Sequence, residues 1–150
     1  MAITYSEFQC TPAYDEHKRL TGLVLWERQT WDGTETLFLF PSVLNFSQRI
    51  GGYLAGKAVR IKAATLILYT LTGARRIRGS IGTTTGVWNF LGPSMIGVQG
   101  DRLDLGLPDA KINFVWNDAT PTNPFLAPDF DTAPAVNNVT ALSVFLEVVE

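Results

Sequence analysis

The chain of 150 residues contains one histidine and one cysteine, which restricts both nucleophilic catalysis and metal binding. A Ser-His-Asp hydrolase needs a histidine as its general base, but His17 lies in the charged segment 13–19 and no G-x-S-x-G motif accompanies it. A tetrahedral zinc site needs four ligands, which Cys10 and His17 cannot supply alone. We therefore expect His17 to be a solvated loop residue, Cys10 to be a buried and inert thiol, and no cofactor to be bound.

Carboxylates offer two further kinds of chemistry. Asp129 and Asp131 are two residues apart, and Asp118 precedes them in the same proline-rich segment, which suits the oxygen ligands of calcium. The spacing does not match the twelve-residue EF-hand loop, so we expect no metal site there. A carboxylate pair for glycoside cleavage would come from distant strands, and no motif selects such a pair. We predict that the protein is not an enzyme.

Basic residues form the most asymmetric pattern in the sequence. Residues 36–100 contain seven basic side chains and no Asp or Glu, whereas residues 1–35 have a net charge of −3 and residues 101–150 have a net charge of −6. Charge asymmetry of this kind argues for contact with a charged partner. The basic residues that we expect at such a contact lie on the longest predicted strand and on the hairpin after it: Arg60, Lys62, Arg75, Arg76 and Arg78.

This charge pattern has three interpretations. In the simplest, the acidic and basic segments mix in the fold and form ordinary surface pairs, which contribute little to stability. In the second, the basic strand of one copy contacts acidic segments of the next copy, with Asp129 and Asp131 among the contacts. In the third, the arginines bind nucleic acid while Tyr69 or Trp88 stacks on bases, but a pI of about 5.4 argues against this. Of the two binding interpretations, we favour self-assembly.

Four tryptophans leave a carbohydrate-binding function open, because aromatic side chains on the face of a sandwich can stack on sugars. Trp26, Trp88 and Trp116 lie in predicted strands, and we expect them in the core. Trp31 lies between two predicted strands, in the turn-like segment 30–34. It is therefore the candidate for an exposed aromatic contact residue.

These residues must be positioned by strands, because the sequence favours β structure throughout. Thirteen glycines and eight prolines divide it into short runs rich in Thr, Val, Ile and aromatic residues. We predict a first hairpin from residues 23–27 and 35–40, because the Asp32-Gly33 dipeptide between them suits a tight turn. Residues 57–72 form the longest predicted strand, and its length predicts a bend or bulge near Ala63-Ala64.

The remaining elements complete the prediction of the fold. Residues 117–138 form a long Pro-rich loop, which we interpret, like the N-terminal segment 1–20, as an extended arm that reaches a neighbour. The chain closes with the strand 141–150, whose apolar residues alternate onto one face. About eight strands without intervening helices predict an all-β fold: an antiparallel two-sheet β-sandwich that is jelly-roll-like.

Composition indicates the size of the domain and its surroundings. The length suits a single domain over residues 1–150, and no polar linker divides it. An apolar share of 46% with 17% charged residues leaves apolar surface that a partner can cover. No apolar run reaches the length of a transmembrane helix, and residues 1–7 do not resemble a signal peptide. We expect synthesis in the cytoplasm and no contact with a membrane.

In style, the sequence resembles the jelly-roll decoration or cement proteins of bacteriophage capsids. The resemblance is carried by residues 57–82 and 141–150 and contains no diagnostic motif, so it transfers no functional residue. It implies a virion protein that forms a homotrimer and stabilises the phage head through noncovalent contacts with the major capsid protein or other virion proteins. A phage tail tube or tail adaptor, or a carbohydrate-binding β-sandwich module, is the alternative.

Overall fold

The computed structural model describes residues 4–41, 58–82, 90–106, 111–113 and 125–149, and all regular structure within them is β-strand. The strands are β1 (Thr4–Tyr14), β2 (Leu20–Thr30), β3 (Ala58–Thr70), β4 (Arg75–Ile81), β5 (Phe90–Gly97), β6 (Arg102–Asp104), β7 (Lys111–Asn113), β8 (Leu126–Phe130) and β9 (Val139–Val148). The predicted all-β fold is confirmed. In this part of the chain, no helix has the length and apolar character needed to cross a membrane.

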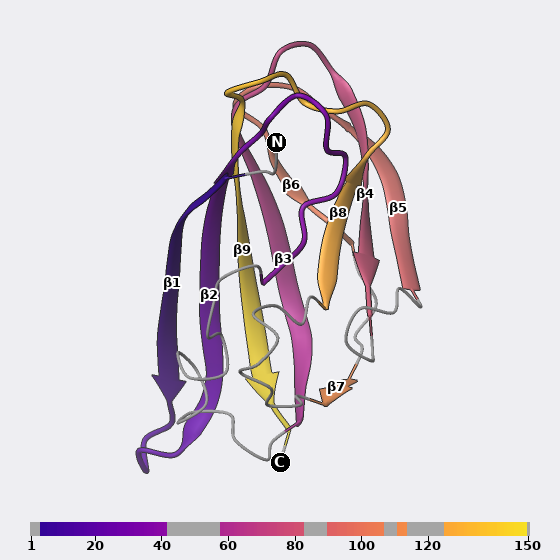
Figure 1. Ribbon diagram of the computed structural model, residues 1–150. Helices are drawn as coiled ribbons and strands as arrows, with labels where there is room; N and C mark the ends of the chain where they lie inside the picture. Colours follow the sequence, from indigo (N-terminus) through magenta and orange to yellow (C-terminus); the bar gives the residue numbers. More distant parts are fainter. Residues whose placement is uncertain (1–3, 42–57, 83–89, 107–110, 114–124, 150) are drawn as a thin grey trace.

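The strands form two antiparallel sheets that pack as a sandwich (Figure 1). The larger sheet has the order β1-β2-β9-β3-β6, and β7 pairs with β3 as well. The smaller sheet has the order β5-β4-β8, and bridges from Leu37 to Asp129 and from Phe40 to Leu126 add the segment 37–40 beside β8. With that segment counted as a strand, the orders β2-β9-β3-β6 and (37–40)-β8-β4-β5 are those of a jelly roll. The predicted jelly-roll sandwich is therefore confirmed.

One hydrophobic core fills the space between the sheets, because the strands alternate buried and exposed side chains. Central strand β9 contributes Leu142, Val144 and Leu146, so the predicted apolar face of the last strand is confirmed. The smaller sheet contributes Ile77 and Ile81 of β4 to the same cluster. Truncating side chains of this size in a core typically costs about 2–5 kcal/mol.

Strand β3 contains the predicted irregularity. Its pairing with β9 shifts by one residue between Ile61 and Ala63, which marks a β-bulge. Val59 faces the core before the bulge, and Leu66 and Leu68 face it afterwards. The extra residue therefore lets a strand of 13 residues cover the core along its whole length.

The predicted first hairpin is wrong. Strand β2 pairs with β1 and β9, and the chain then crosses to the smaller sheet. Trp31 accounts for the crossover, because its N–H donates to the carbonyl of Asn138 at 2.9 Å and its carbonyl accepts from the N–H of Asn137 at 2.9 Å. Asp32 does make a turn, since its Oδ1 accepts from the N–H of Thr34 at 2.8 Å. That turn joins two sheets and not two neighbouring strands.

The two expected arms belong largely to the sandwich. Strand β1 covers most of the N-terminal segment 1–20 and pairs along its length with β2. In the segment 117–138, residues 117–124 lie outside the described residues, and the rest includes β8 and the buried Pro134 and Asn138. The core explains this correction, because Phe125 and Phe130 are buried there and hold the segment against the other strands.

Candidate functional site

Folding mixes the acidic and basic segments of the sequence. On the larger sheet, Arg60 of β3 stands opposite Glu147 of β9. On the smaller sheet, Arg78 of β4 stands opposite Asp129 of β8. Each pair joins the basic middle of the chain to its acidic last third, as the simplest interpretation of the charge pattern expects.

The five predicted basic residues do not form one surface. Arg60 and Lys62 lie on β3 in the larger sheet, near the end of the strand that pairs with β7. Arg75, Arg76 and Arg78 lie on β4 in the smaller sheet, which follows the opposite end of β3. An extended strand from Arg60 to that opposite end spans about 33 Å. A joint anion-binding surface of all five residues is therefore excluded.

Arg76 and Arg78 meet two acidic residues on the outer face of the smaller sheet. The register places Arg78 between Ser94 of β5 and Asp129 of β8. Asp131 lies beside Arg76, whose N–H donates to its Oδ1 at 3.1 Å. Together with Ile77, these side chains line an open hollow of about 210 Å³. We call Arg76, Arg78, Ser94, Asp129 and Asp131 the Arg/Asp cluster.

The Arg/Asp cluster keeps its charged groups available for further contacts. Arg76, Arg78 and Asp131 are exposed, and Asp129 is half-buried. Among the described residues, neither guanidinium group nor the Asp129 carboxylate has a hydrogen bond or an ion pair within 4.0 Å. Opposite charges on neighbouring strands still attract each other by roughly 0.2–1 kcal/mol. The two arginines and two aspartates of the cluster thus balance in charge, and they form no salt bridge with one another.

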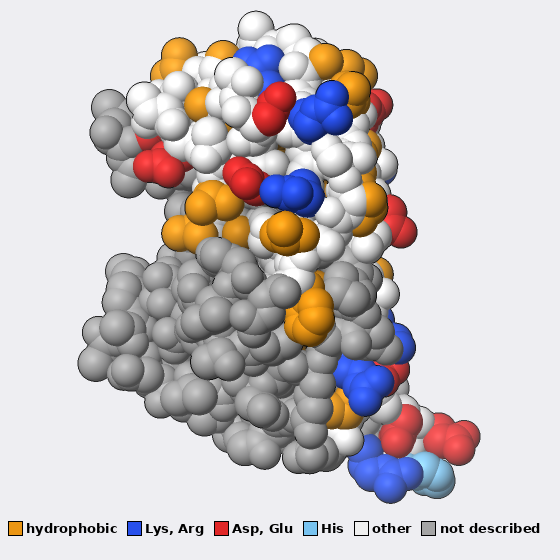
Figure 2. Space-filling view, turned by 90° about the vertical axis from the view of Figure 1, so that its right-hand side faces the viewer, with side chains coloured by type: hydrophobic (Ala, Val, Ile, Leu, Met, Phe, Trp, Pro, Cys, Tyr) orange, Lys and Arg blue, Asp and Glu red, His pale blue; other side chains and the backbone are white. Residues whose placement is uncertain are grey.

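Apolar side chains flank the Arg/Asp cluster on both sides. On β5, Leu91 is 57% exposed and Ile96 is 61% exposed. Beyond β8, Leu37 pairs with Asp129 and Leu39 is 37% exposed. Figure 2 shows basic and acidic side chains next to each other on this side of the molecule, with hydrophobic side chains around them. Exposed apolar patches next to polar residues are typical of interaction surfaces, and here two apolar strips lie on either side of the charged cluster.

The structure corrects the role predicted for Trp31. The side chain is buried, with 1% of its surface exposed, and its Nε1–H donates to Thr140 Oγ1 at 3.0 Å. Its ring makes edge-to-face contacts with Phe38 and Phe130, at centroid distances of 6.4 and 4.8 Å. Trp31 is a core residue at the crossover between the sheets, so it cannot be the exposed aromatic that stacks on a sugar.

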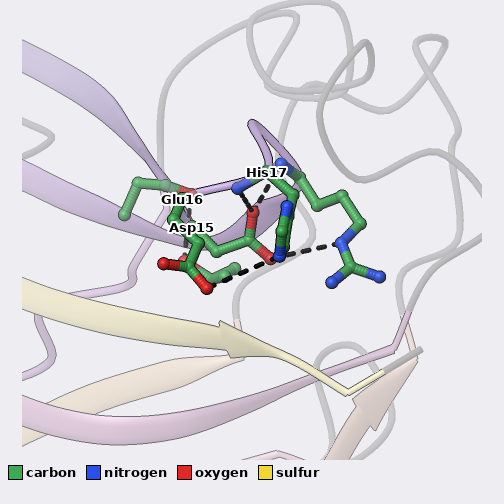
Figure 3. Close-up of polar contacts among 6 residues, drawn as sticks. Asp15, Glu16 and His17 are labelled. Atoms are coloured by element: carbon green, nitrogen blue, oxygen red, sulfur yellow. Dashed lines mark hydrogen bonds and ion pairs between the residues drawn. The ribbon is translucent and has the colours of Figure 1, made fainter.

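The histidine lies at the tip of the β1–β2 turn (Figure 3). Asp15 organises this turn, since its Oδ1 accepts from the N–H groups of His17 and Arg19 at 2.8 and 2.9 Å. The Nε of Arg19 also donates to Asp15 Oδ2 at 3.2 Å, and His17 Nε2 lies 3.5 Å from Glu16 Oε1. His17 is exposed, so the prediction of a solvated loop histidine is confirmed.

The thiol and the carboxylates complete the candidate chemistry. Cys10 is half-buried against the core, and burial raises the pKa of its thiol to about 11, which keeps the thiol protonated and unreactive near neutral pH. Asp118 lies outside the described residues. Within the described ranges, no three His, Cys, Asp or Glu side chains are grouped so that they could hold a metal ion.

Sequence reasoning missed the contributions of β5 and of the segment 37–40 to this surface. The signal for β5 was weak, because Pro93 interrupts it and its exposed residues are apolar. Leu37 and Leu39 do alternate with Phe38 and Phe40, as in a strand. The predicted hairpin, however, places this strand beside residues 23–27, whereas the structure places it beside β8 in the smaller sheet. Comparisons of the chain with protein-family models, with curated proteins and with solved structures found no match.

Proposed function

We propose that the protein is a non-enzymatic virion component, a decoration or cement protein that stabilises a phage head by noncovalent contacts. The observation that carries this proposal is the outer face of the smaller sheet, where the Arg/Asp cluster lies between exposed apolar residues. The jelly-roll fold is common among viral capsid proteins, although the same fold also serves lectins and cupins. The surface, more than the fold, therefore supports a role in assembly.

The chemistry of this surface suits binding between proteins. Apolar side chains of β5 supply buried area on contact, while the charged cluster supplies orientation and register. The proposed partners are further copies of the chain, together with the major capsid protein or another virion protein. A tail tube or tail adaptor would use contacts of the same kind, so the position in the virion needs a direct test.

Binding to purified phage particles tests the proposed function. We expect negative-stain microscopy to show regular added density on heads that lack a decoration protein, and those heads to resist heat better with the protein bound. Ile96→Asp places a charge in the exposed apolar part of β5 and is expected to abolish the added density. Arg102→Asp, an exposed change on β6 of the larger sheet, is the control and is expected to bind normally. Density on tails and not on heads would contradict the decoration role.

A further inference from the structure

The outer face of the smaller sheet is arranged in four columns, one for each neighbouring strand. Residues paired across antiparallel strands point to the same face, so the register decides which side chains share it. From one edge to the other, the columns are mainly apolar, basic, acidic and apolar: Leu91 and Ile96 on β5 with Ser94 between them, Arg76 and Arg78 on β4, Asp129 on β8 with Asp131 directly after it, and Leu37 and Leu39 in the segment 37–40.

This order of columns is complementary to itself. A two-fold axis that runs parallel to the strands, between β4 and β8, brings the basic column of one copy over the acidic column of the other. The same axis brings the apolar column of β5 over the apolar column of the segment 37–40. A two-fold axis perpendicular to the strands would instead place arginine over arginine, which is unfavourable. We propose that two copies of the chain pair face to face through this surface, about the axis parallel to the strands.

The charged groups are suited to such pairing. Arg76, Arg78 and Asp129 have no side-chain hydrogen bond or ion pair among the described residues, so contact with a second copy breaks none. In the paired state, Arg78 of each copy faces Asp129 of the other. The hollow of about 210 Å³ beside these residues leaves room for the guanidinium group of the second copy. Pairing of this kind does not depend on a virion role, because it needs only the chain itself.

The size of the surface sets the expected strength of pairing. Four strands span about 19 Å and six residues of β5 span about 17 Å, so the contact covers on the order of 300 Å² of each copy. Stable complexes bury roughly 800 Å² of each partner. We therefore expect a weak pair with a dissociation constant of about 10 μM to 1 mM. A two-fold contact closes on two copies, so by itself it gives a dimer and not the trimer that the resemblance implies.

Charge reversal in two separate variants tests the pairing. Arg78→Asp places carboxylates opposite each other across the axis, and Asp129→Arg places guanidinium groups opposite each other. Each variant alone is expected to be monomeric. In an equal mixture, the introduced carboxylate of the first variant faces the introduced guanidinium of the second, and the remaining native Arg78 faces the remaining native Asp129. The mixture is therefore expected to pair about as strongly as the original protein.

Sedimentation equilibrium provides the measurement, with circular dichroism to check that each variant is folded. At about 0.1–1 mM, the average mass of the original protein should rise from 16.5 kDa toward twice that value, and added salt should lower it again. Arg102→Asp, a matched charge reversal on the larger sheet, should pair like the original protein. The proposal is overturned if the original protein stays monomeric at about 1 mM, if the folded single variants still self-associate, or if their mixture does not pair. Loss of capsid binding with pairing intact would contradict only the virion role.

Discussion

Single buried polar residues in the core differ in whether their hydrogen-bonding groups have partners. Trp31 is satisfied, because its Nε1–H reaches Thr140. Gln29 lies on the inner face of β2, directly opposite Thr140, and is fully buried. Its Oε1 and Nε2 have no hydrogen-bond partner within the described part of the chain. A buried polar group without a hydrogen-bond partner typically costs about 1–3 kcal/mol. The burial of the Gln29 amide therefore lowers the free energy of unfolding.

Replacing the Gln29 amide by an apolar group of similar length should therefore stabilise the protein. We expect Gln29→Met to raise the free energy of unfolding by about 1–2 kcal/mol, because the thioether fills the same space without unsatisfied polar atoms. Gln99→Met is the matched control, since Gln99 Oε1 accepts from the N–H of Leu71 at 3.2 Å and its loss should destabilise. Urea unfolding of both variants measures the difference. A lower stability for Gln29→Met would show that its amide has a partner, such as a buried water.

At the scale of elements, strand periodicity predicts a strand well where one face is buried. Strands β3 and β9 follow that rule, and the excess length of β3 correctly indicated its bulge. The crossover after Trp31 was not predictable, because a turn signal does not specify which strand comes next to which. Its direction depends on hydrogen bonds to Asn137 and Asn138, which lie more than a hundred residues away in the sequence.

The Arg/Asp cluster also depends on which strands are neighbours, which local sequence patterns do not specify. The sequence singled out Arg76, Arg78, Asp129 and Asp131 as charged candidates, but it did not indicate that they are neighbours. Their proximity follows from the pairing of β4 with β8, and Pro128 within β8 obscures that strand in the sequence. Register between distant strands is a property of the whole fold, so local patterns predict the members of such a cluster and not its assembly.

The close packing of β2 against β9 predicts that a larger residue at Gly22 lowers the stability of the protein. Gly22 of β2 lies where an added Cβ would overlap the carbonyl oxygen of Leu146 on β9. Because that neighbour is backbone, it cannot rotate away, and Gly22→Ala should force the central strands apart. We expect a loss of about 1–3 kcal/mol in the free energy of unfolding. Val24→Ala changes an exposed residue of the same strand and should cost less than about 1 kcal/mol. Equal losses in thermal unfolding of the two variants would contradict this view of the Gly22 contact.

At the scale of the whole molecule, folding converts a strongly segregated sequence into a surface of mixed charge. The basic middle of the chain meets acidic residues on both sheets, at Arg60 with Glu147 and at Arg78 with Asp129. A nucleic acid approaching Arg76 and Arg78 therefore also meets two carboxylates within the same cluster. Since phosphate binding depends on an excess of positive charge, this mixing argues against the nucleic-acid interpretation.

Removing the carboxylates of Asp129 and Asp131 should increase the affinity of this face for polyanions. We expect the original protein to pass through a heparin or DNA column at about 0.15 M salt without retention. The double variant Asp129→Asn/Asp131→Asn leaves both arginines without the acidic neighbours in and directly after β8, so it should be retained more strongly and elute as salt increases. Asp101→Asn/Asp104→Asn, in and before β6 of the larger sheet, changes the net charge equally and should have a smaller effect. Strong retention of the original protein, lost on Arg76→Ala/Arg78→Ala, would instead favour nucleic acid as the partner of this face.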